Sequence, residues 1–94
     1  MSMPDPMQLG YRRTREGLMK TKVGEMAGRV WRTLGEREEV AVSSLPQMLK
    51  EKGEIVYQAL GWLAKEDKID FHKKGGKTHV SLSHKEREIF TKAL

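Results

Sequence analysis

The chain of 94 residues contains no cysteine, only three prolines and few aromatic side chains, which make up 6% of its residues. Without cysteine, neither a disulfide framework nor a thiolate-bound metal supports the fold, so side-chain packing has to stabilise it. No apolar run approaches the roughly 20 residues that cross a bilayer, and the first residues lack the basic and then apolar pattern of a signal peptide. We therefore expect a soluble cytoplasmic protein with one domain, one modest core and no membrane segment.

Signatures of catalysis are also missing. The sequence has no Ser, His and acid arrangement in a recognisable context, no phosphate-binding glycine loop and no zinc-hydrolase spacing. No segment indicates the pocket that a small-molecule substrate needs. We expect a protein that is not an enzyme, requires no cofactor, holds no metal and binds no small-molecule substrate.

The net charge of +5 is unevenly distributed along the chain. Residues 1–22 carry five basic and two acidic side chains, whereas residues 23–52 carry five of each sign. We interpret residues 1–20 as a flexible basic arm. Its basic cluster consists of Arg12, Arg13 and Arg15. Because a tight nonspecific nucleic-acid binder normally has one strongly basic patch, this distribution favours only limited phosphate contact.

Apolar residues recur at helical spacing from residue 23 to residue 34, and they form one face. They are Val23, Met26, Ala27, Val30, Trp31 and Leu34. Thr21 is a suitable cap and Gly35 a suitable stop, so we predict the first helix over Lys22–Leu34. Gly28 here and Gly61 further along each cost a helix roughly 1 kcal/mol relative to alanine. Either they let helices approach closely, or the fold tolerates them.

A short strand at Val40–Val42 and a second helix follow. Ser44, with Gln47 three residues later, matches a capping box at the start of that helix. After a polar break, we predict a third helix over Glu54–Asp67, with Tyr57 among its core-facing residues. Ser83 and Glu86 match a second capping box, which opens a C-terminal helix.

The segment from Ile69 to Leu82 predicts a β-hairpin whose register follows from its turn. With Gly75 and Gly76 as a two-residue turn, the pairs run from Lys74 with Lys77 to Ile69 with Leu82. This register places four residues on the core face: Ile69, Phe71, Val80 and Leu82. His72 and His79 then face each other on the solvent face, where exposed imidazoles are more often unliganded than bound to metal.

These elements together predict an α+β winged helix-turn-helix domain. It has a three-helix core, a short strand and a two-stranded wing over residues 21–82, with an extra C-terminal helix over residues 83–94. In this architecture the third helix is the element offered to a partner.

Two motifs carry a family resemblance. Gly24 to Trp31 read Gly-Glu-Met-Ala-Gly-Arg-Val-Trp, and Tyr57 to Ile69 contain Ala-Leu-Gly-Trp-Leu-Ala-Lys-Glu-Asp-Lys-Ile. From about Met19 to Leu82, the chain resembles a small bacterial and archaeal family of winged helix-turn-helix domains of unknown function. The resemblance implies a winged-helix fold and a DNA-binding or regulatory role, and it implies no catalytic residues.

The leading hypothesis for function is binding of DNA. Gln58 and Lys65 lie opposite the core-facing side of the third helix, where a major-groove reader carries hydrogen-bonding side chains. Lysines surround the hairpin tip, where they would contact phosphates or only keep an exposed edge soluble. These lysines are Lys73, Lys74 and Lys77, and the arginines of the arm would reach further along the duplex.

A competing hypothesis is a protein-interaction module. Ile55, Ala59 and Trp62 are spaced i, i+4 and i+7, which makes a second apolar stripe on the third helix. An exposed tryptophan beside isoleucine is typical of protein interfaces, and a homodimer is the simplest version. The alternative is that Trp62 is ordinary core beneath the hairpin or the C-terminal helix.

Overall fold

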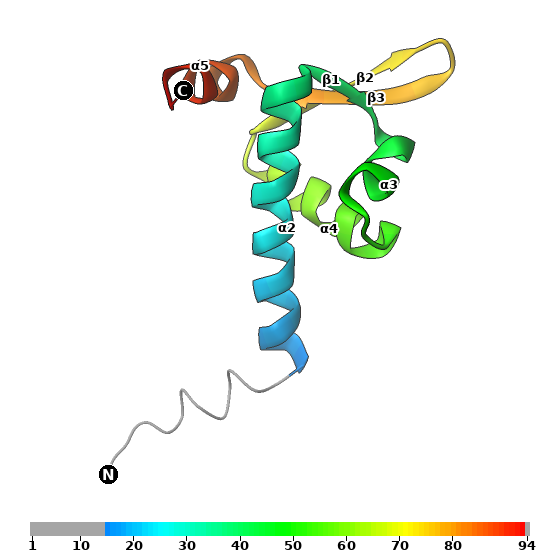
Figure 1. The fold of residues 1–94 in the computed structure, drawn as a ribbon, viewed down its shortest axis with the longest axis vertical. Coiled ribbons are helices and arrows are strands. Elements are labelled where there is room, and N and C mark those ends of the chain that lie inside the picture. The colour runs from blue at the N-terminus through cyan, green and yellow to red at the C-terminus, as the bar shows by residue number, and fades with distance from the viewer. Residues whose placement is uncertain (1–14, 94) are drawn as a thin grey trace.

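A computed structural model describes residues 15–93 of the chain, and the side chains from residue 21 onward. Figure 1 shows a long first helix that leads to a small sheet, with the shorter helices on its sides. The elements are α2 (Arg15–Arg37), β1 (Glu39–Ala41), the 3-10 helix η1 (Val42–Ser44), α3 (Leu45–Leu49), α4 (Gly53–Lys65), β2 (Ile69–Lys74), β3 (Lys77–Leu82) and α5 (His84–Ala93). The predicted winged helix-turn-helix architecture is confirmed.

The first helix is longer than predicted at both ends. It was expected over Lys22–Leu34, but α2 spans Arg15–Arg37. Residues 15–20, assigned to the arm, are therefore helical. Met19 extends the apolar spacing backwards from Val23, and the segment is rich in good helix formers, so the cap signal of Thr21 has no effect. Residues 1–14 lie outside the described part of the chain, where the arm stays a prediction.

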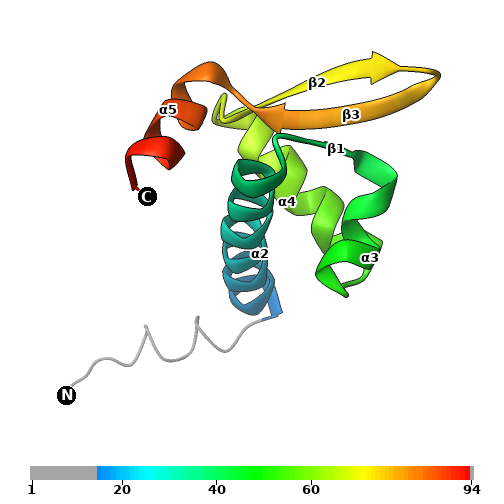
Figure 2. The same ribbon diagram turned by 45° about the horizontal axis from the view of Figure 1, so that its top comes forward.

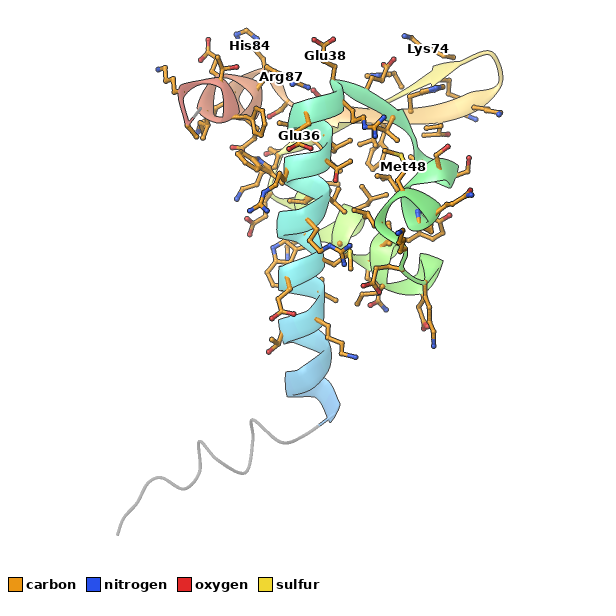
Figure 3. All side chains as sticks on the ribbon, in the orientation of Figure 1. Glu36, Glu38, Met48, Lys74, His84 and Arg87 are labelled. Carbon is orange, nitrogen blue, oxygen red and sulfur yellow. The ribbon has the colours of Figure 1, made fainter. Side chains whose placement is uncertain are left out.

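The C-terminal end of α2 is held by α5 rather than by Gly35. A Cβ atom at Gly35 would overlap the ring of Phe90, so this glycine serves helix packing instead of ending the helix. The guanidinium of Arg87 donates hydrogen bonds to the carbonyl oxygens of Gly35, Leu34 and Glu38, at 2.8, 3.1 and 3.0 Å. Figure 3 shows Arg87 beside the C-terminal end of α2. The carbonyl oxygen of Leu34 also accepts the backbone N–H of Glu38 at 2.9 Å. The last carbonyl groups of a helix run out of N–H donors from the helix itself, and Arg87 supplies side-chain donors at this end. Arg87 therefore caps α2 from a distant part of the chain.

The sheet is antiparallel and three-stranded, with the order β1-β3-β2 (Figure 2). All six predicted pairs of the hairpin are confirmed, from Ile69 with Leu82 to Lys74 with Lys77. The short strand lies one residue earlier than predicted, at Glu39–Ala41, and pairs with β3. This pairing gives the sheet a third strand. Because a strand of three residues is stable only beside others, β1 depends on its pairing with β3.

The core lies where α2, α4 and the sheet meet. Its fully buried large side chains are Leu34, Leu45, Val30, Val56 and Val80. Two aromatic residues that were predicted to face the core are about half exposed: Tyr57 at 47% and Phe71 at 48%. Tyr57 instead lies over the start of α4, where its ring covers Gly53. Phe71 pairs with the buried Val80, but it belongs to the edge strand, which has no neighbouring strand on its outer side within the described residues.

The two predicted capping boxes have different outcomes. Ser44 makes no side-chain cap to α3, because η1 leads directly into that helix and already turns the chain. The predicted box with Gln47 is therefore wrong. At α5, the backbone N–H of Glu86 donates to the hydroxyl oxygen of Ser83 at 3.4 Å, so this cap is present.

Candidate nucleic-acid interface

The tip of the wing carries exposed lysines around a tight turn. Gly75 and Gly76 have φ angles of 56° and 82°, which glycine adopts at little cost, as in the two-residue hairpin turn that was predicted. Lys73 and Lys77 are exposed, and neither has an ion-pair partner within the described residues. The wing projects away from α2 on the same side as α3, as Figures 1 and 2 both show. These two lysines are therefore free to contact a phosphate backbone.

Lys74 differs from its neighbours because it is paired within the domain. Its Nζ atom lies 2.6 Å from Oε1 of Glu39. Glu39 belongs to β1, the strand at the opposite edge of the sheet. The other carboxylate oxygen of Glu39 contacts Nε2 of His72. The hydrogen bond from Lys74 is the main cause that lowers the pKa of Glu39. Desolvation opposes it, and the contact with His72 lowers the pKa further. Part of the positive charge predicted for the tip is thus neutralised.

On α4, Gln58 and Lys65 are both exposed, as the leading hypothesis requires. They lie seven residues apart, which is two turns or about 10.5 Å along the axis. Glu54, in the first turn of the same helix, is also exposed and would repel phosphate, whereas Glu66, just after the helix, pairs with Lys68. The outer face of α4 therefore has few hydrogen-bond donors for reading bases and no excess of positive charge.

The arginines of the N-terminal segment are separated from the wing. Arg15 is the first residue of α2, whereas Arg12 and Arg13 lie outside the described residues. The 23 residues of α2 correspond to about 33 Å of helix. Arg15 and the sheet lie at opposite ends of this helix (Figure 1). The structure thus brings no arginine from this segment next to the wing lysines among the residues it describes.

The stripe predicted on the third helix is not a continuous exposed surface. Ala59 is fully buried, because α4 packs against α2 along this line. Ile55 is partly buried and lines a cleft of about 440 Å³ between α2 and the start of α4. Trp62 is 42% exposed and lines a different groove. Ala59 cannot contact a partner, so the proposed stripe has to be corrected.

The cleft beside Ile55 was not found from the sequence. The side chain of Arg29 lies at its edge and donates to the carbonyl oxygen of Leu49 at 2.7 Å. The same guanidinium pairs with Glu51 at 2.9 Å. The lining residues carry three positive and three negative charges: Lys22, Arg29 and Lys52 against Glu25, Glu51 and Glu54. This balance gives the cleft no preference for an anionic backbone.

Neither a metal site nor a membrane span is found in the part of the chain that the structure describes. No group of three or more His, Cys, Asp or Glu side chains there is arranged to hold a metal ion. His72 and His79 face each other in the register, but His72 contacts Glu39, and Nδ1 of His79 lies 3.3 Å from the carbonyl oxygen of Lys77. No helix in this part of the chain is long and apolar enough to span a membrane.

A helix-turn-helix followed by a hairpin wing defines the class of winged-helix domains. Comparison with known families agrees with this class. The model of the family described as "Winged helix-turn-helix domain (DUF2582)" matches residues 18–82, and the chain belongs to this family. The chain is also 43% identical over 51 residues to the uncharacterized protein MJ1608 of Methanocaldococcus jannaschii, covering 51% of this chain and 71% of that protein.

Two solved structures share the fold at low sequence identity. ZitR of Lactococcus lactis, in apo form and with two substitutions, superposes with a TM-score of 0.67 at 15% identity, over 98% of this chain and 71% of ZitR. HlyU of Vibrio vulnificus, a transcriptional regulator, superposes with a TM-score of 0.64 at 16% identity, over 93% of each chain. At these identities the likeness establishes the winged-helix fold and nothing more specific.

Proposed function

We propose that this domain is a noncatalytic winged-helix module that binds double-stranded DNA and takes part in transcription regulation. The observation that carries the proposal is the exposure of the unpaired Lys73 and Lys77 at the tip of a wing that accompanies a helix-turn-helix. The regulatory part of the proposal is supported by the likeness in fold to a transcriptional regulator. Winged-helix and other helix-turn-helix domains place one helix in the major groove while flanking elements contact the backbone.

The charges of the domain indicate which kind of binding to expect. Lys73 and Lys77 would contact phosphates, which position a protein on DNA without reading sequence. Gln58 and Lys65 would face the major groove, but Glu54 opposes the approach of phosphate beside them. Lys74 contributes less than the other wing lysines because Glu39 holds it. Binding should therefore be weak, dominated by the backbone and steeply dependent on salt.

Replacement of the two unpaired wing lysines tests this proposal. The double variant Lys73→Gln/Lys77→Gln should weaken binding to a random duplex at every salt concentration. Because each lost phosphate contact removes about 0.9 from the slope of log K against log salt, the slope should fall by about two. The control is Lys85→Gln/Lys92→Gln, which removes the same charge from exposed positions on α5. Fluorescence anisotropy with a labelled duplex at several salt concentrations measures both quantities.

The control decides how the result is interpreted. If the wing variant and the α5 variant lose affinity equally, then the protein binds DNA through net charge alone and the assignment of the wing is wrong. If the wild-type protein shows no binding at low salt, the proposed function fails. Amide chemical-shift changes on adding duplex should be confined to α4 and the wing, and they should disappear as salt is raised.

Interaction with another protein is a second candidate function, and one observation favours it. Trp62 on α4 and Ile89 on α5 are 42% and 45% exposed, and they line the same groove. Burial of such side chains is a main source of affinity at protein interfaces. An apolar contact of this kind weakens little as ionic strength rises, unlike phosphate binding. The same salt series therefore distinguishes the two candidates.

A further inference from the structure

The groove that Trp62 and Ile89 line runs beside α2 on the side of the domain that carries α5. It has a volume of about 490 Å³, and its residues come from α2, α4 and α5 and from the turn before β2. Trp31 lies at its edge, with its indole N–H donating to Oε1 of Glu86 at 2.7 Å and its ring edge-on to Phe90 at 5.4 Å. These contacts hold Trp31 in place beside the groove. The two large exposed side chains of the groove, Trp62 and Ile89, have nothing over them among the described residues.

The outward face of α2 beside this groove carries almost no side chains. Gly24 and Gly28 line the groove and are exposed, and a Cβ atom at either position would meet nothing within 4 Å. The expectation that Gly28 and Gly61 let helices of the same chain approach closely is therefore wrong, because Gly61 is equally open. Gly24 and Gly28 leave room at this face for a helix from outside the described residues.

Two charged side chains without an ion-pair partner in the described part of the chain flank Gly24 and Gly28 on the side of α2 that faces away from the groove. Glu25 and Arg32 are exposed, and neither has an ion-pair partner among residues 21–93. Glu25 lies three residues before Gly28, and Arg32 lies four residues after it. If a second α2 crosses antiparallel at Gly28, then Glu25 of each copy comes within about 1.5 Å, along the helix axis, of the level of Arg32 in the other. The charge pattern is thus complementary to itself.

We infer that this groove and the glycine face of α2 form an interface between two copies of the chain, related by a two-fold axis near Gly28. With such an axis, each flank of α2 lies next to the same flank of α2 in the other copy. One flank then forms two reciprocal ion pairs between Glu25 and Arg32. The other flank covers Trp62 and Ile89 of both copies. The inference does not depend on DNA binding, and it replaces the stripe of Ile55, Ala59 and Trp62 by a different surface.

Charge reversal tests this inference. Glu25→Arg places two positive groups opposite each other in the dimer, and Arg32→Glu places two negative groups opposite each other. Each single variant should raise the dimer dissociation constant by about tenfold or more, because two favourable pairs become two repulsive ones. An equimolar mixture of the two variants restores opposite charges at all four positions. It should therefore form a mixed dimer at least as tightly as the wild-type protein dimerises.

Matched controls separate the interface from net charge. Asp70→Arg and Lys92→Glu make the same charge changes at exposed positions that line neither the groove nor the cleft beside Glu25. They should leave the dissociation constant unchanged, and mixing them should have no effect. Sedimentation equilibrium over a range of concentrations measures the association, and circular dichroism checks that each variant is folded.

A steric variant gives a second, independent measurement. Gly28→Leu should abolish dimerisation by filling the space that the second helix occupies, whereas Gly61→Leu, at an exposed glycine outside the groove, should not. In the wild-type protein, tryptophan emission should shift to shorter wavelength as concentration rises, since Trp62 becomes covered. A protein that has the mass of one chain at every concentration would overturn the inference. So would a dimer that tolerates both charge reversals and Gly28→Leu.

Discussion

The wing and α5 both adjoin the C-terminal end of α2, but they are attached to it by different means. The wing is joined through the sheet, by backbone pairing and by the buried side chains of Ile69, Val80 and Leu82, while the contacts on its outer face, such as that of Lys74 with Glu39, are exposed. α5 is joined by partly buried side chains that bridge more than 50 residues, Arg87 to the α2 carbonyl groups and Trp31 to Glu86. The outer face of the wing therefore keeps side chains available for a partner, whereas α5 uses its own side chains to complete the domain.

This difference changes how α5 should be regarded. The family match ends at residue 82, so α5 lies outside it. Nevertheless, Arg87 supplies the cap of α2, and Glu86 and Ile89 line the groove beside Trp62. α5 is therefore an integral part of this chain's structure, and its removal should affect α2 before it affects the wing.

The largest expected effect comes from breaking the α5 attachment. Arg87→Met removes three hydrogen bonds from a charged donor to carbonyl oxygens at and just beyond the C-terminal end of α2. Since such bonds contribute about 1.5–3 kcal/mol each and these are partly exposed, we expect a loss of about 3 kcal/mol in the free energy of unfolding. Urea unfolding measures it. Lys85→Met, on the exposed side of α5, is the control and should change little.

Amide hydrogen exchange in the same variant then tests whether the two attachments are independent. Exchange should accelerate in α5 and in the last turn of α2, while the hairpin amides keep their protection relative to global unfolding. Equal acceleration in the wing and in α5 would mean that the two regions open together and are not attached to α2 independently.

A smaller effect is expected at the glycines, with opposite signs on the two kinds of site. Gly35→Ala should destabilise the domain by about 1–3 kcal/mol, because its methyl group would overlap the ring of Phe90 on α5. Gly61→Ala should stabilise the domain by up to about 1 kcal/mol, because it adds helix propensity in open space. Thermal unfolding of the two variants side by side measures both. Stabilisation by Gly35→Ala would show that α5 does not press on this position.

The smallest effect is expected on the wing, from the titration of Glu39. Its pKa in the folded protein lies below the ordinary value of 4.5. The contacts with Lys74 and His72 therefore add stability above pH 4.5, and this contribution is lost as the pH falls through the lower, folded-state pKa. Glu39→Gln should remove this part of the pH dependence and should lower stability slightly at neutral pH. Thermal unfolding between neutral and acidic pH, compared for the two proteins, checks it. If both curves have the same shape, Glu39 carries no such linkage.

Local patterns predicted the parts of the fold that depend on neighbours in sequence. The hairpin register was correct throughout, because a two-residue glycine turn leaves one pairing that places Ile69, Val80 and Leu82 on a common face. The prediction that α4 leads directly into β2 was also correct, because it too depends on residues that are close together in the sequence. In contrast, the start of α2 was misplaced by seven residues, since Thr21 resembles a cap although the apolar spacing continues to Met19.

For the candidate site, the sequence predicted which residues are exposed better than it predicted which other residues they contact. Gln58, Lys65, Lys73 and Lys77 are exposed as expected, yet the pairing of Lys74 with Glu39 and the burial of Ala59 could not be predicted. Helical spacing shows that Ala59 belongs to an apolar stripe, but it does not show which neighbouring helix covers that stripe.

By itself, the sequence determined the order of the elements, the register of the wing and the apolar face of α2. These features arise from steric and solvation preferences that act over a few residues. Only the tertiary structure decided that Arg87 caps α2, that Gly35 receives Phe90, and that Trp62 shares a groove with Ile89. Such contacts join segments far apart in the chain. They depend on the angles at which helices pack, and those angles are set by the whole core rather than by any one stretch of residues.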